Sequence, residues 1–400
     1  MTFPPGLRAL DHADFRRFWS GQLVSLIGTW MQSVAQSWLV LQLTDSPLRL
    51  GLIGTFQFAP ILLFAVAAGA VADRLPKRRL ILATQSALAA QAFTLAALVG
   101  TGTVRYWHVA ILALLMGIAN TLDMPARQSF IVEMVGKEDL VNAVALNSAA
   151  FNAARIVGPA AAGLLIAGAG IGPAFFLNGL SFLVVIVALL RTPTEGWPRP
   201  RQGTTLFEEM LEGLRYARRT PVTAVVLVLV LVVSLCAFNF SVLVPLLARD
   251  VLHEGPDGFG FLMAVLGLGA VIGALSLALF GSRPLGLAGI EATGAVACAA
   301  TLALAGARHF WLAVPLLAIV GYASIVFMTS CNTTLQLTAP DELRGRVMSL
   351  YTFAFGGVFP LGSFLTGAIA EAFGVPAAFA AGGGAGLALV MAIVVWWRVR

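Results

Sequence analysis

The stretch Gly69-Ala-Val-Ala-Asp-Arg-Leu-Pro-Lys-Arg-Arg79 separates two long apolar segments, residues 48–72 and 80–100. Its last seven residues, 73–79, carry five charges, whereas the segments on either side are almost free of them. Each apolar segment reaches the ~20 residues that a transmembrane helix needs. A short charged turn between two such segments predicts a helical hairpin that crosses a membrane twice.

The composition extends this prediction to the whole chain. Of the 400 residues, 59% are hydrophobic and 11% are charged, whereas soluble domains have roughly 25% charged residues. Twelve spans of ~20 residues would use roughly 240 residues, which matches the hydrophobic share. The composition therefore excludes a disordered chain, a disulfide scaffold and a large soluble catalytic domain. The predicted fold class is an all-α membrane protein with twelve transmembrane helices.

The spans can be placed by the charged and Gly/Pro breaks between them. We expect them at about residues 18–42, 48–72, 80–100, 107–126, 142–167, 173–191, 221–247, 258–281, 286–306, 310–331, 348–370 and 376–397. The first segment could be mistaken for a signal peptide. Its length of about 25 residues and the spans that follow it favour a retained span.

The distribution of basic residues predicts the orientation. The net charge of +6 would suggest nucleic-acid binding in a soluble protein. With the N-terminus placed in the cytoplasm, the inner segments hold 20 Lys and Arg, the outer loops hold four, and Arg155 lies within a span. The positive-inside rule then predicts a multi-pass protein of the cell membrane with both termini cytoplasmic. The lipid bilayer is the expected surrounding, and no nucleic-acid partner is expected.

The chain divides at one long polar stretch, residues 192–220, which is predicted to be a cytoplasmic linker. It opens with a proline-rich segment and continues as an amphipathic helix, which would lie on the membrane surface or be a solvated linker helix. Glu138-Asp139-Leu140 recurs 203 residues later as Asp341-Glu342-Leu343. Residues 1–191 and 221–400 are therefore predicted to be two pseudo-symmetric six-helix bundles, as in rocking transporters.

The loop at residues 69–79 is similar to G-x-x-x-D-R-x-G-R-[RK], the loop signature of the Major Facilitator Superfamily, with Pro76 where a glycine is usual. The resemblance implies a cytoplasmic charge lock formed by Asp73, Arg74 and an acidic residue at the cytoplasmic end of span 4, which Asp123 matches. A substrate ligand is the alternative role for Asp123. The candidate gating residues are Gly69, Asp73, Arg74, Lys77, Arg78 and Asp123.

Two further segments carry the resemblance. Gly158-Pro159-Ala-Ala-Ala-Gly163 in span 5 is similar to the G-P-x-x-G-G element of the superfamily's antiporters, with Ala162 replacing one glycine. A packing motif without a role in transport direction is the alternative. Residues 120–148 resemble the branch that holds the enterobactin exporter and macrolide-efflux proteins. Many exporters of this branch have an acidic residue near the position of Thr29, which this chain lacks.

Polar side chains within spans indicate a cavity, because they are costly in lipid. A stripe of amides and hydroxyls recurs at helical spacing in span 1: Gln22, Ser25, Thr29, Gln32 and Gln36. In span 5, Arg155 is a deep charge that could bind substrate, or else pair with Asp123 or a carbonyl. The candidate cavity residues are Gln32, Gln36, Asn152, Arg155, Asn239 and Tyr351. They suit a large amphiphilic molecule, and Arg155 would accept an anionic one.

Together these features predict a secondary active transporter that exports a small amphiphilic molecule, a drug or siderophore, by proton-coupled alternating access. An importer or facilitator of a small solute is the alternative. Asp123 and Glu291 are the candidate proton carriers, because both are acidic residues at the cytoplasmic side of spans. A membrane enzyme is disfavoured, because the four histidines lie in loops or at interfaces and no Walker A loop occurs. We expect a monomer without cofactor or metal ion.

Overall fold

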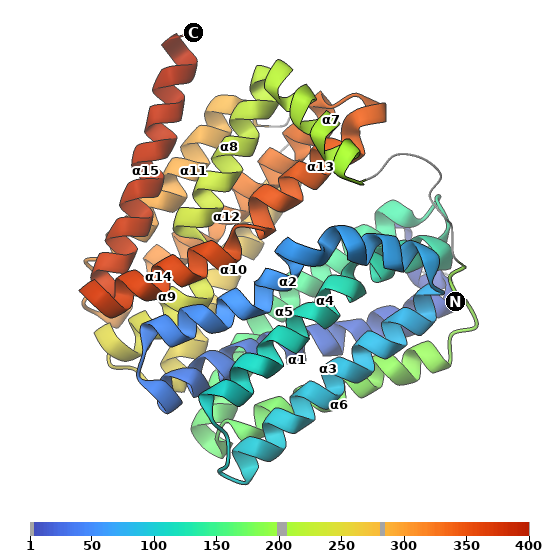
Figure 1. The fold of residues 1–400 in the computed structure, drawn as a ribbon, viewed down its shortest axis with the longest axis horizontal. Helices are drawn as coiled ribbons and strands as arrows, with labels where there is room; N and C mark the ends of the chain where they lie inside the picture. The colour runs from blue at the N-terminus through green and yellow to red at the C-terminus, as the bar shows by residue number, and fades with distance from the viewer. Residues whose placement is uncertain (1–3, 198–205, 281–284, 400) are drawn as a thin grey trace. The chain divides into compact units, whose positions relative to one another are not determined.

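The computed structural model describes residues 4–197, 206–280 and 285–399, which are helical with short connecting turns (Figure 1). Their contacts define two compact units. The N-unit comprises Met1–Thr44 and Ala59–Gln202, and the C-unit comprises Asp45–Phe58 and Gly203–Arg400. The domain boundaries inferred from the linker remain a prediction.

The described part of the N-unit holds one short 3-10 helix and six long helices, the second of which it shares with the C-unit. These are η1 (Pro5–Asp11), α1 (Ala13–Thr44), α2 (Pro47–Arg74), α3 (Lys77–Gly100), α4 (Tyr106–Val135), α5 (Leu140–Ala169) and α6 (Gly172–Leu190). Helix α1 packs against α5 and α6, and α3 packs against α4 and α6. This packing brings residues of α1, α3, α4, α5 and α6 together in one bundle.

Glycines allow α1 to lie very close to two neighbours. A Cβ atom added at Gly28 would lie 2.5 Å from the Asn178 Oδ1 atom of α6. One added at Gly158 of α5 would lie 2.5 Å from the Trp30 Cβ atom of α1. Helices in membranes associate through such small residues, since lipid gives no hydrophobic drive for one helix to bind another. These glycines therefore fix which side chains of α5 and α6 face α1.

The C-unit contains more helices than spans, because two of its spans are broken. Its helices are α7 (Leu206–Arg219), α8 (Pro221–Ala237), α9 (Phe240–Leu246), the π-helical turn η2 (Leu247–Val251), α10 (Pro256–Phe280), α11 (Leu287–Leu304), α12 (Phe310–Thr338), α13 (Asp341–Gly356), α14 (Phe359–Phe373) and α15 (Val375–Val399). The sequence predicted unbroken spans at 221–247 and 348–370. Each of these spans exists, but α8 gives way to α9 at Asn239, and α13 gives way to α14 at Gly357.

Eleven helical segments among the described residues are long and apolar enough to cross a membrane. They correspond to the second through twelfth predicted spans. The first predicted span is α1, which has 32 residues but is rich in glutamine, serine and threonine, so its hydropathy is lower. The all-helical membrane fold predicted from the sequence is thereby confirmed.

The helical part of the linker, α7, belongs to the C-unit. It packs against α13 and α8 and lies beside α13 in Figure 1. The Glu212 carboxylate forms an ion pair with Arg346 at 2.6 Å, and the Tyr216 hydroxyl donates a hydrogen bond to the carbonyl of Thr338. This part of the linker is thus attached to the second bundle by specific polar contacts.

Candidate functional site

Asp123 lies in α4 at the centre of a cluster of polar contacts in the N-unit. Its Oδ1 atom accepts hydrogen bonds from the Thr84 hydroxyl at 2.6 Å and from Gln85 Nε2 at 3.1 Å. Its Oδ2 atom accepts from Arg127 Nε and Nη2, both at 2.8 Å. The guanidinium of Arg127 also lies 5.2 Å from the ring centre of Phe18. We call these five residues the Asp123 cluster.

The Asp123 cluster joins α4 to α3 and α1. Oδ2 accepts two N–H groups of one arginine and Oδ1 accepts two neutral donors, and hydrogen bonds between charged groups are stronger than those between neutral ones. The sequence analysis missed Arg127 as the partner. Its position four residues after Asp123 on the same helix is the signal that could have found it.

The other residues of the predicted charge lock form no hydrogen bond or ion pair with this cluster among the described residues. Asp73 is half-buried in the last turn of α2, and Arg74 ends that helix. Neither side chain forms a hydrogen bond or ion pair in the described structure. A Cβ atom added at Gly69 would meet no atom within 4 Å among the described residues. No polar contact among the described residues therefore links Asp73 to the Asp123 cluster.

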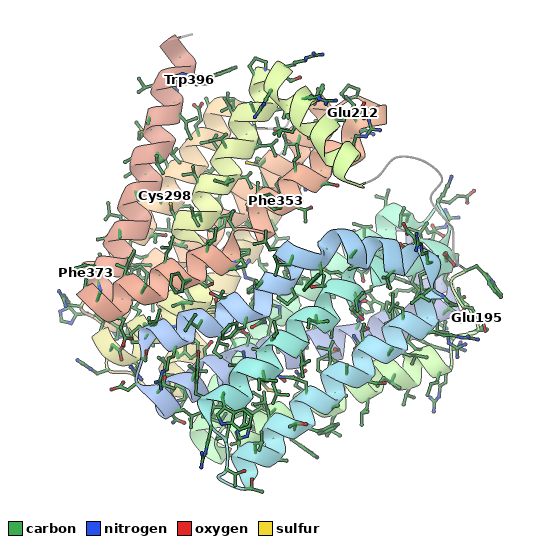
Figure 2. The ribbon with its side chains drawn as sticks, in the orientation of Figure 1. Glu195, Glu212, Cys298, Phe353, Phe373 and Trp396 are labelled. Atoms are coloured by element: carbon green, nitrogen blue, oxygen red, sulfur yellow. The ribbon has the colours of Figure 1, made fainter. Side chains whose placement is uncertain are left out.

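Lys77 and Arg78 begin α3 and bind the first part of the linker. Their backbone N–H groups donate to the carbonyls of Gly196 at 2.9 Å and Glu195 at 3.1 Å, which satisfies two free donors of the helix start. Lys77 is buried; its Nζ atom donates to the carbonyl of Trp197 and lies 3.7 Å from Glu133. Glu195, labelled in Figure 2, belongs to this segment. The linker is thus docked on the signature loop.

Gln32 forms part of a buried amide network within the N-unit. Its Nε2 atom donates to Gln91 Oε1 at 3.0 Å, and its Oε1 atom accepts from Asn178 Nδ2 at 2.7 Å. These bonds connect α1 to α3 and α6. Gln36, one turn further along α1, is also buried. In this structure the amide of Gln32 is therefore hydrogen-bonded to side chains of neighbouring helices.

Arg155 lies in the middle of α5 beside two aromatic rings. Its guanidinium carbon is 6.0 Å from the Trp30 ring centre, and the Trp30 and Phe151 rings meet edge to face at 5.7 Å. The Nε atom is buried and has no hydrogen-bond partner. Asn152 is half-buried, and its amide donates to the Ser148 carbonyl. Arg155 and Asp123 do not form an ion pair in the described residues.

The antiporter-like element Gly158, Pro159 and Gly163 is buried within α5. Gly158 holds α5 against α1, where a Cβ atom would also lie 2.8 Å from the Ile27 carbonyl oxygen. Pro159 has no N–H group, so the carbonyl of Arg155 lacks the donor that a helix normally supplies four residues later. The element thus fixes the surroundings of Arg155.

The candidate residues of the C-unit lie near the two helix breaks. Asn239 directly precedes α9 but makes no side-chain capping hydrogen bond; its amide donates to the Leu235 carbonyl at 2.8 Å, while its Oδ1 atom is buried without a partner. Gly362 of α14 leaves room for it, since an added Cβ atom would lie 2.6 Å from that oxygen. The Tyr351 hydroxyl of α13 donates to the carbonyl of Met328 at 3.3 Å.

Glu291 is a buried acidic residue in the first turns of α11, the helix that also carries Cys298 in Figure 2. Its Oε1 atom has no hydrogen-bond partner. Its Oε2 atom lies 3.8 Å from an Nη atom of Arg398, which is mostly exposed. Glu291 is thus poorly paired, in contrast to Asp123.

The family of this chain follows from its similarity to known proteins. A family model described as transmembrane secretion effector matches residues 5–400. The chain belongs to this family of the Major Facilitator Superfamily. The multidrug efflux pump Tap of Mycolicibacterium fortuitum is 31% identical over 367 residues, which cover 88% of each chain. The staphyloferrin A transporter of Staphylococcus aureus is 24% identical over 90% of this chain and 91% of its own length.

Solved structures agree with this assignment at the level of the fold. The nucleoside transporter NupG matches with a TM-score of 0.76 over 97% of this chain and all of its own, at 12% sequence identity. The family model and the efflux-pump relative confirm the resemblance to the Major Facilitator Superfamily. This secretion-effector family member is a multi-pass membrane transporter related to efflux pumps, and it is not an enzyme.

Proposed function

We propose that this transporter exports a small amphiphilic molecule, a drug or siderophore, by proton-coupled alternating access. The observation that carries the proposal is the 31% identity to a multidrug efflux pump over 88% of the chain. The test is dye uptake into everted membrane vesicles that contain the full-length protein. We expect dye to accumulate only when the vesicle interior is more acidic than the medium, and we expect a protonophore to abolish this accumulation. Equal flux with and without the gradient would instead indicate a facilitator.

The open carboxyl of Glu291 makes it the better candidate for the proton carrier. Protonation of Asp123 would weaken four short polar contacts, whereas the Glu291 Oε1 atom can take up a proton without losing a hydrogen bond. Ionisable residues inside membranes are costly and often serve as proton relays. We therefore assign proton transfer to Glu291 and a structural role to Asp123.

Replacement of Glu291 by glutamine is expected to reduce uptake driven by the pH gradient to the level of vesicles without the protein. Substrate exchange without a gradient should persist, because the amide keeps the shape of the side chain but cannot carry a proton. Glu138→Gln removes the same charge from an exposed residue and is the control. If flux in the Glu291→Gln variant still depends on the pH gradient, the proton carrier is another group.

Asp73 is the more suitable member of the proposed charge lock. A negative charge in the last turn of a helix is disfavoured by the helix dipole, and Asp73 has no compensating partner in the described structure. It therefore brings no stability to this conformation. We infer that Asp73 forms its stabilising contact in a second conformation of the transport cycle.

Asp73→Asn is expected to reduce the rate of transport about 5- to 150-fold, which corresponds to the roughly 1–3 kcal/mol typical of couplings between conformational states. Membrane insertion should stay unchanged and thermal stability should stay equal or rise slightly, because the carboxylate forms no hydrogen bond or ion pair in this conformation and its charge opposes the helix dipole. Transport and the melting temperature of the same preparation are the two measurements. Normal transport by Asp73→Asn would remove Asp73 from the lock.

We further propose a monomer in the cell membrane, with both termini in the cytoplasm. The excess of basic residues in the inner segments supports this orientation. Labelling of a cysteine introduced at either end, in intact and in permeabilised cells, tests it.

A further inference from the structure

Arg155 is a charged side chain within a span that lacks a counter-ion. No acidic side chain of the described residues lies within ion-pair distance of it, and its enclosed Nε atom has no acceptor. Asp123, the alternative partner suggested by the sequence, already uses both oxygens in its own cluster. Burying a donor or a charge without a partner is unfavourable. The folded chain therefore does not itself supply a counter-ion for Arg155, and we infer that the partner is an anion from outside the chain.

The rings beside Arg155 give the position a second chemical property. Phe151 lies four residues before Arg155, so both project from the same face of α5. Trp30 contacts both of them from α1, with distances of 6.0 Å to the guanidinium carbon and 5.7 Å between the rings. Phe151 remains 46% exposed, so protein atoms leave this aromatic surface uncovered.

The position of these groups is held by the backbone. Gly158, one turn after Arg155, lets α5 lie close against the Trp30 Cβ atom and the Ile27 carbonyl of α1, where any side chain would clash. The guanidinium is consequently presented next to the rings at a fixed height in the bundle. Such preorganisation lowers the cost of binding, because little ordering is needed when the ligand arrives.

We propose that Arg155, Trp30 and Phe151 form a binding site for an amphiphilic carboxylate, a molecule with one anionic carboxyl group next to an apolar ring. The guanidinium donates to both carboxylate oxygens in a fixed planar geometry, which a point charge such as lysine does not match. The rings contact the apolar part. This inference rests on the proposed export function, and it narrows the substrate class from amphiphilic molecules in general to organic acids.

The test is a matched pair of small probes on the purified full-length protein in detergent. 1-Naphthaleneacetate carries the carboxylate, whereas 1-naphthaleneacetamide has the same ring and nearly the same shape without the charge. We expect the acid to raise the melting temperature in a saturable manner and to bind about tenfold or more tightly than the amide, as loss of a charged hydrogen bond implies.

Three variants separate binding from folding. Arg155→Gln should lose the preference for the acid, and Arg155→Lys should keep part of it, because the charge remains but the two-pronged geometry does not. Arg308→Gln removes the same charge from an exposed loop residue and should behave as the wild type. If Arg155→Gln does not fold, the intermediate preference of Arg155→Lys still decides the question.

The outcomes that overturn the site are distinct from those that overturn the transport function. Equal binding of the acid and the amide, or an unchanged preference in Arg155→Gln, overturns the site. Stabilisation by phosphatidylglycerol that depends on Arg155, without any effect of naphthaleneacetate, also overturns it in favour of a lipid phosphate. Selective binding of the acid by a protein that does not accumulate dye in everted vesicles leaves the site standing and overturns the proposed export.

Discussion

Replacing Asp123 by leucine is expected to destabilise the protein by about 3 kcal/mol, the cost of leaving one partner of a buried ion pair alone. The carboxylate is the acceptor for Arg127, Thr84 and Gln85, and only 9% of its side-chain surface is exposed. The arginine is itself 84% enclosed, so water can compensate for the lost partner only in part. The loss should appear as a lower melting temperature of the purified full-length chain.

The double variant Asp123→Leu with Arg127→Met is the matched control. It removes both charges and keeps apolar bulk at both positions, and replacement of a buried pair by apolar groups is often neutral. We expect the double variant to recover most of the stability that Asp123→Leu loses. A double variant as unstable as the single one would mean that the contacts to Thr84 and Gln85, rather than the ion pair, hold α4 to α3.

The distinction between Asp123 and Glu291 could not be made from the sequence. Both are acidic residues near the cytoplasmic ends of apolar segments, and the pattern gives them equal standing as proton carriers. The partners that separate them come from other helices, such as Thr84 and Gln85 on α3. Helical periodicity shows which face of one helix is polar, but it does not show which helix lies opposite.

The polar stripe of α1 illustrates the same limit. Its spacing correctly predicts that Gln32 avoids lipid, because Gln32 is buried in the N-unit. Its partners Gln91 and Asn178 are 59 and 146 residues away in the chain, so no local pattern could connect them. Burial against protein could be predicted, whereas the choice between a structural amide network and a substrate cavity required the packing of α3 and α6.

The sequence predicted where the spans lie, but it did not predict which of them are broken into two helices. The two corresponding spans of the repeated halves each carry a proline midway, Pro159 and Pro360. Helix α5 continues through Pro159, but the C-unit counterpart breaks before Pro360, where Gly356 and Gly357 precede the proline. A proline removes one hydrogen bond, and adjacent glycines lower the helix propensity of the same turn. Together they separate α13 from α14, which a hydropathy average over 20 residues does not detect.

Gly158→Ala is expected to cost about 1–3 kcal/mol, the typical penalty for overpacking a tight contact. The added Cβ atom would lie 2.5 Å from the Trp30 Cβ atom and 2.8 Å from the Ile27 carbonyl oxygen. Backbone atoms of α1 cannot move aside as a flexible side chain could, so α5 must shift. Because Arg155 is one turn away, the shift should also weaken binding of naphthaleneacetate. The melting temperature and the probe affinity are the two measurements.

Gly69→Ala provides the matched control for that prediction. Both glycines lie inside long helices, so both replacements gain the same helix propensity, up to ~1 kcal/mol. Gly69 meets nothing within 4 Å in the described residues, so its alanine variant should be as stable as the wild type or slightly more stable. The difference between the two variants then isolates the contact between α5 and α1. Equal stability of both variants would mean that the closeness at Gly158 is not what fixes Trp30 beside Arg155.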